Sequence, residues 1–101
     1  MSIENKRIEL EVAREIVDIV ESYDYEYSAR KDVISNIVAN GMSIDNDIFK
    51  KYQREMIEFN VQFNQAKKEV EEKYVIPATN GALCSWTLDY STGKLTIDIK
   101  E

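Results

Sequence analysis

The sequence contains no histidine, one cysteine, one proline and three glycines among its 101 residues. Without histidine, a Ser-His-Asp triad, a Cys-His pair and every histidine-bearing metal site are excluded. One cysteine excludes a disulfide within the chain. The acidic cluster Asp45, Asn46, Asp47 lacks the glycine and the closing glutamate of a calcium loop, and no glycine-rich phosphate-binding motif is present. We therefore expect a protein that is not an enzyme and that binds no metal and no cofactor.

Basic residues are outnumbered, and long apolar runs are missing. The 13 Lys and Arg residues face 19 Asp and Glu residues, a net charge of −6. Direct binding to nucleic acid is therefore disfavoured, because counterion release rewards basic surfaces. No run of eighteen apolar residues occurs, and the N-terminus lacks the apolar core of a signal peptide. We expect a cytoplasmic protein with no membrane association.

A long amphipathic helix is predicted over residues 44–74. Its apolar positions follow steps of three and four residues, the spacing of a coiled-coil seam. Ile44 and Phe49 are placed to form a hydrophobic staple, and Asp45 is the predicted N-cap. A helix of this length needs an equally long partner, which only the N-terminal half can supply. The seam consists of Phe49, Tyr52, Met56, Phe59, Phe63, Ala66 and Val70.

The N-terminal region, residues 1–40, is predicted to be mainly helical. Residues 7–12 alternate like a strand but can also start a helix, and helix is favoured from Glu9 onward. The stretch 9–40 is one helix bent near residues 23–28, or two helices with Ser28 capping the second; two helices in near-continuous line are favoured. Arg14 and Asp18 form an i,i+4 pair. Asn40-Gly41 predicts a helix end, because glycine adopts the left-handed conformation without a Cβ penalty. The apolar face is predicted to hold Val12, Ile16, Ile19, Tyr23, Val33, Ile34, Ile37 and Val38, widened by Ala13, Val17 and Val20.

A β-hairpin is predicted over residues 83–99. Pro77 ends the long helix near Tyr74, and residues 78–82 form a loop. Alternation at Cys84, Trp86, Leu88 and Tyr90, then at Leu95, Ile97 and Ile99, indicates two strands joined by a turn at residues 91–94. A lone hairpin is marginal in water, so it must pack on the helices, with residues 8–12 as a candidate third strand. The fold class is α+β: a single domain, 1–101, with a long antiparallel helical hairpin followed by a β-hairpin.

Two sets of residues are candidates for partner binding. The first is acidic and rich in tyrosine, and it would engage a basic partner or imitate a nucleic-acid backbone. The alternative is a solvated helix face with two of its tyrosines packed in the core. This set consists of Glu21, Tyr23, Asp24, Tyr25, Glu26 and Tyr27.

The second set lies in the β-hairpin, where an open strand edge would accept an extended peptide. We assign Trp86, Thr96 and Asp98 to it. The alternative is an edge that Lys94, Asp98 and Lys100 protect from pairing. Cys84 is interpreted as a small apolar filler on the inward face rather than a reactive thiol.

Several short motifs resemble the small CXXX-repeat peptide modification system proteins, which are encoded beside radical SAM maturases and Cys-repeat precursor peptides. The similarity covers roughly residues 29–99. The resemblance implies an accessory role in which the chain binds a precursor peptide or its maturase, and it implies no catalytic residues. The longer, tyrosine-rich acidic N-terminal region departs from the family pattern. The motifs are Ala29-Arg30-Lys31-Asp32, the helix with Asp47, Phe49, Tyr52 and Phe63 that ends at Lys73-Tyr74, Trp86-Thr87-Leu88-Asp89 and Thr92-Gly93-Lys94-Leu95.

Two functions follow as hypotheses. The first is a small cytoplasmic protein that binds a protein or peptide and assists maturation of a radical SAM-modified peptide. The alternative is an acidic phage-type inhibitor that mimics nucleic acid and blocks a nucleic-acid-binding protein such as a CRISPR effector. A homodimer is a further expectation, because Phe49, Phe59 and Phe63 exceed what one facing helix covers.

Overall fold

The computed structural model describes residues 6–41 and 45–100 and confirms the α+β class. The elements follow in the order β1 (Lys6–Glu11), α1 (Arg14–Ala39), α2 (Asp47–Val70), the π-helix η1 (Glu71–Val75), α3 (Ile76–Thr79), β2 (Cys84–Leu88) and β3 (Lys94–Ile99). Their contacts divide the chain into two compact units. Residues 6–19 and 67–100 form the sheet unit, and residues 20–41 and 45–66 form the helical hairpin unit.

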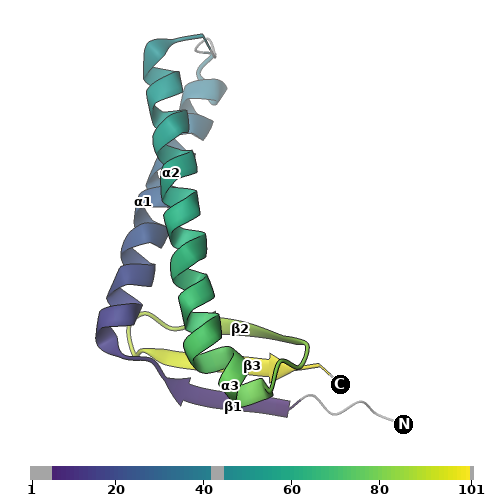
Figure 1. Ribbon diagram of the computed structural model, residues 1–101. Helices are drawn as coiled ribbons and strands as arrows, with labels where there is room; N and C mark the ends of the chain where they lie inside the picture. Colours follow the sequence, from purple (N-terminus) through teal and green to yellow (C-terminus); the bar gives the residue numbers. More distant parts are fainter. Residues whose placement is uncertain (1–5, 42–44, 101) are drawn as a thin grey trace. The chain divides into compact units, whose positions relative to one another are not determined.

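The sheet unit contains a three-stranded antiparallel sheet with β3 between β1 and β2 (Figure 1). The candidate third strand is therefore confirmed, and it lies beside β3. Ile97 pairs with Ile8 on one side and with Trp86 on the other. Leu95 and Ile97 are fully buried, so the centre of the sheet supplies the core of this unit.

The start of α1 differs from the prediction. Residues 9–11 belong to β1, and the helix begins at Arg14 rather than Glu9. The residues of β1 alternate between apolar and polar side chains and pair with β3. This strand pairing outweighs the helical preference of the same residues. Ala13 has no side chain that caps a helix, and its backbone N–H donates a 3.2 Å hydrogen bond to the Tyr74 hydroxyl instead.

α1 is one unbroken helix, so the favoured break near residues 23–28 is wrong. Ser28 does not cap a second helix; its hydroxyl donates a 3.2 Å hydrogen bond to the Asp24 carboxylate one turn earlier. With no Gly or Pro in this stretch, nothing forces the helix to end. The predicted stop at residues 40–41 is confirmed: Gly41 has φ +75°, and its N–H donates to the Val38 carbonyl.

In the helical hairpin unit, α1 and α2 run antiparallel and side by side (Figure 1). The Tyr27 and Phe63 rings stack with their centroids 6.4 Å apart. The Arg30 guanidinium lies 4.8 Å from the centre of the Phe59 ring. The predicted seam of α2 is confirmed, because all seven of its residues are buried or half-buried. On α1 the buried face includes Val17 and Val20, while Ile19 and Val38 are exposed, contrary to the prediction. Ala13, which precedes the helix, is exposed as well.

α2 begins one residue later than its predicted cap implies. The Asn46 side-chain oxygen accepts a 2.8 Å hydrogen bond from the Ile48 N–H, so Asn46 is the N-cap rather than Asp45. The predicted staple partner Ile44 lies outside the described residues. Phe49 is buried within the first turn.

The helical backbone does not end before Pro77. It continues through η1 and α3 to Thr79, and Asn80 closes it in the left-handed conformation at φ 53°. The Ile76 N–H donates to the Glu71 carbonyl, the five-residue step of a π-turn. A proline ring collides with the carbonyl four residues earlier in a regular helix, and the wider π-turn relieves that collision. Ala66, Val70, Val75 and Thr79 are all buried. Their steps of four, five and four residues show that the π-turn keeps them on one face.

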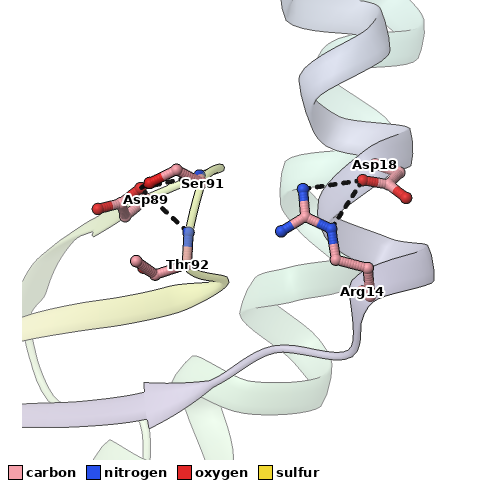
Figure 2. A network of polar contacts seen from close by, with 5 residues as sticks. All are labelled: Arg14, Asp18, Asp89, Ser91 and Thr92. Carbon is pink, nitrogen blue, oxygen red and sulfur yellow. Dashed lines mark hydrogen bonds and ion pairs between the residues drawn. The ribbon is translucent and has the colours of Figure 1, made fainter.

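The turn between β2 and β3 is organised by Asp89 (Figure 2). Its carboxylate accepts hydrogen bonds from the Ser91 hydroxyl at 2.6 Å and the Ser91 N–H at 2.9 Å. These bonds lower the pKa of Asp89 below its usual value. β2 ends at Leu88, so Tyr90 belongs to the turn rather than to the strand. Gly93 has φ +76° and lies against Val12, whose N–H donates to the Gly93 carbonyl at 2.9 Å.

Candidate functional site

The acidic tyrosine set is only partly exposed. Glu21 and Tyr25 face solvent, and the Tyr25 side chain is 70% exposed. Tyr23 and Asp24 are half-buried, and Asp24 accepts the hydrogen bond from Ser28. The alternation of acids and phenols along α1 therefore does not place all six side chains on one open surface.

Glu26 and Tyr27 belong to the packing of the helical hairpin unit. Glu26 forms an ion pair with Arg30, whose Nε also lies 3.3 Å from the Glu55 carboxylate. Partial burial by itself lowers the pKa of Arg30, but the hydrogen bond to Glu55 and the charge of Glu26 outweigh it and raise that pKa. Tyr27 stacks on Phe63. These residues hold α1 to α2, as the alternative interpretation expected of the tyrosines.

Trp86 lies in the middle of β2 and is half-buried. Its indole N–H donates a 3.1 Å hydrogen bond to the Glu71 carboxylate of η1. The face of the sheet that carries Trp86 is therefore the face that η1 adjoins. Cys84 and Leu88 share that face, and Cys84 is a free, half-buried thiol. Its position agrees with the interpretation as a small filler on the inward face.

Thr96 and Asp98 do not lie at a sheet edge. Both belong to β3, which pairs with β1 on one side and β2 on the other. Arg7 donates a 3.0 Å hydrogen bond to Asp98, which ties that side chain across the sheet to β1. The candidate edge was placed on the wrong strand, because the sequence did not reveal that β1 pairs beside β3.

The open edges are the outer sides of β1 and β2. At one end of β2 the Asp89 N–H donates to the Lys94 carbonyl, and at the other the Lys100 N–H donates to the Leu83 carbonyl, both at 2.9 Å. Bonded residues alternate along an antiparallel ladder, so the odd-numbered residues of β2 bond to β3. The N–H and C=O groups of Cys84, Trp86 and Leu88 therefore point away from the sheet. Within the part of the chain that the structure describes, no strand pairs with them.

The two edges differ in charge. Four of the six residues of β1 are charged, namely Lys6, Arg7, Glu9 and Glu11. All four are exposed, and charge at an edge strand discourages pairing with another chain. β2, with the sequence Cys-Ser-Trp-Thr-Leu, has no charge and no proline. β2 is therefore the edge that lacks these protections.

The apolar side chains of β2 are also incompletely covered. Leu88, Trp86 and Cys84 are half-buried, whereas their neighbours on β3 are buried. Leu83, just before β2, is 75% exposed. Apolar surface therefore remains accessible beside the open backbone groups. Of this site, sequence reasoning identified Trp86 and missed the backbone of Cys84 and Leu88, although the uncharged run at residues 82–88 was a usable signal.

The described residues offer no metal-binding cluster and no membrane-spanning helix. Among residues 6–41 and 45–100, no three His, Cys, Asp or Glu side chains come together in an arrangement suited to a metal ion. None of the described helices has the length and apolar character needed to cross a membrane. Comparison of the chain with protein-family models, with curated proteins and with solved structures found no match. The candidate site therefore rests on the geometry of β2.

Proposed function

We propose that this chain is a binding protein without catalytic activity, and that it takes up an extended segment of a partner polypeptide as a fourth strand on the outer edge of β2. The observation that carries the proposal is the uncharged edge at Cys84, Trp86 and Leu88, with three N–H and three C=O groups pointing outward. In strand addition the main-chain hydrogen bonds supply affinity, and the alternating side chains supply specificity.

The partner class comes from the resemblance to the CXXX-repeat peptide modification proteins. Strand addition takes up a peptide segment in an extended conformation, and a precursor peptide is the partner that the resemblance implies. The accessory role in cytoplasmic peptide maturation and the precursor or its maturase as partner are thus parts of the proposal. A homodimer is not required for it.

The acidic-inhibitor hypothesis has weaker support. Of the six residues that it needs, Glu21 and Tyr25 are exposed, while Glu26 pairs with Arg30 and Tyr27 stacks on Phe63. A mimic of a nucleic-acid backbone needs several free carboxylates on one surface.

The test is an NMR titration of the ¹⁵N-labelled chain with peptides selected from a random display library. Bound peptide should slow hydrogen exchange at the outward amides of Cys84, Trp86 and Leu88. The outward amides of Arg7, Glu9 and Glu11 on the charged edge serve as the internal control and should be unaffected. A library that yields no binder, or binders that protect other amides, would contradict the proposal.

A further inference from the structure

The side of β2 that pairs within the sheet shows which sequence pattern fits this strand. Its partner β3 places Leu95, Ile97 and Ile99 beside Leu88, Trp86 and Cys84, with all six side chains on one face. The three β3 residues are buried. On the opposite face Thr96 lies beside Thr87, and polar or charged residues occupy the remaining positions. The strand that already pairs with β2 therefore carries an apolar residue at every second position.

The outer side of β2 presents the same alternation to a new strand. In an antiparallel pair, residues opposite each other place their side chains on the same face of the sheet. The residues opposite Leu88, Trp86 and Cys84 would cover the apolar surface that these half-buried side chains leave accessible. The intervening residues would face solvent beside Thr87 and Ser85, both of which are exposed.

We infer that the segment taken up at β2 is a five-residue antiparallel strand with apolar residues at positions 1, 3 and 5 and polar residues at positions 2 and 4. Position 3 lies opposite Trp86, where a β-branched residue is preferred because aromatic and β-branched side chains pair well across strands. Antiparallel pairing is the direction of every pair in this sheet and the slightly more stable one. This inference rests on the proposed function and adds the sequence class of the partner.

The probe is the peptide Lys-Leu-Thr-Ile-Asp-Ile-Lys, the sequence of residues 94–100, in which Leu, Ile and Ile occupy positions 1, 3 and 5. N-methylation of the central Ile removes the N–H that faces Trp86, whereas N-methylation of the Thr alters an N–H that faces away. The first change should weaken binding about tenfold or more, and the second less than about threefold. A probe with Ser in place of Leu and both Ile residues should bind about tenfold more weakly, because it covers less apolar surface.

On the protein, the variant Cys84→Pro removes one outward N–H at the first residue of β2, where proline is compatible with a strand. It should weaken probe binding about tenfold. The matched control is Glu9→Pro, which makes the same change on the outer side of β1 and should alter affinity by less than about twofold. Far-UV circular dichroism checks that both variants fold, and the N-methylated probes test the geometry if either does not.

The outcomes separate the two proposals. Equal binding of the apolar and Ser probes at the outward amides would overturn the inference and leave the proposed function standing. Failure of every selected peptide to protect those amides would overturn both. β2 itself alternates apolar and polar residues, so a second copy is the competing occupant. A dimer in sedimentation equilibrium that dissociates in Cys84→Pro and persists in Glu9→Pro would overturn the peptide assignment.

Discussion

Gly93→Ala should destabilise the sheet unit by about 2–4 kcal/mol. Gly93 has φ +76°, and a non-glycine residue in that conformation costs about 1 kcal/mol. A Cβ atom there would lie 3.3 Å from the Val12 carbonyl oxygen and 3.7 Å from a methyl group of the fully buried Val17. Val12 also donates a hydrogen bond to Gly93, so it retreats only by stretching that bond. Crowding of this kind adds about 1–3 kcal/mol.

Gly81→Ala is the matched control. Gly81 has φ +79° and belongs to the same unit, but nothing lies within 4 Å of an added Cβ. Its replacement should cost about 1 kcal/mol from backbone strain alone. The difference between the two variants therefore isolates the contact with Val12 and Val17.

Urea unfolding followed by fluorescence measures both losses, because Trp86 is the only tryptophan and lies in β2 of the same unit. Thermal unfolding is a second measurement. At about 4 °C per kcal/mol, the melting temperature should fall by about 8–16 °C for Gly93→Ala and by about 4 °C for Gly81→Ala. If the two variants lose the same free energy of unfolding within about 0.5 kcal/mol, an added Cβ atom at residue 93 does not crowd Val12, and the prediction is refuted.

Two further predictions concern charged groups. Arg30→Ala should lower the free energy of thermal unfolding by about 1–2 kcal/mol, because it removes contacts with Glu26, Glu55 and the Phe59 ring. The control Arg14→Ala should lower it by less than about 0.5 kcal/mol, because the pair of Arg14 with Asp18 is exposed. Equal losses in the two variants would contradict this prediction. The depressed pKa of Asp89 means that its hydrogen bonds stabilise the fold above the usual value of 3.8 and are lost as pH falls through the lower folded value. The gap in unfolding free energy between wild type and Asp89→Ala should therefore be constant near neutral pH and close in strong acid, and a gap that widens on acidification would refute the assignment.

Local patterns predicted much of the fold. The three-and-four spacing of α2 identified its buried seam, and Asn40-Gly41 marked the end of α1, because both depend on neighbours within the same element. The alternation of residues 8–12 and 95–99 suggested strands for the same reason. Errors appeared where distant segments decide the outcome. The residues of β1 form a strand rather than a helix only because β3 lies beside them, and no local pattern reveals that partner.

For the candidate site, too, local patterns predicted some residues correctly and missed what distant segments decide. Trp86 was identified from its strand, but Thr96 and Asp98 were assigned to an edge because a two-stranded hairpin leaves both strands open. Among the described strands, β1 occupies one side of β3, so the open side of the hairpin is that of β2. Tyr27 and Glu26 were assigned to a surface because sequence alone does not show that Phe63 and Arg30 engage them.

The π-turn at Glu71–Val75 also bears on how the length of this chain can change. An α-helix turns each residue by about 100°, so losing one residue from the middle of α2 would rotate everything that follows away from its burial site. At the π-turn the helix already carries one residue more than a regular turn holds. A chain one residue shorter there keeps Val75 and Thr79 in phase with Val70 by closing an ordinary turn. This segment is thus where a single-residue deletion is absorbed without turning the buried face beyond it away from its neighbours.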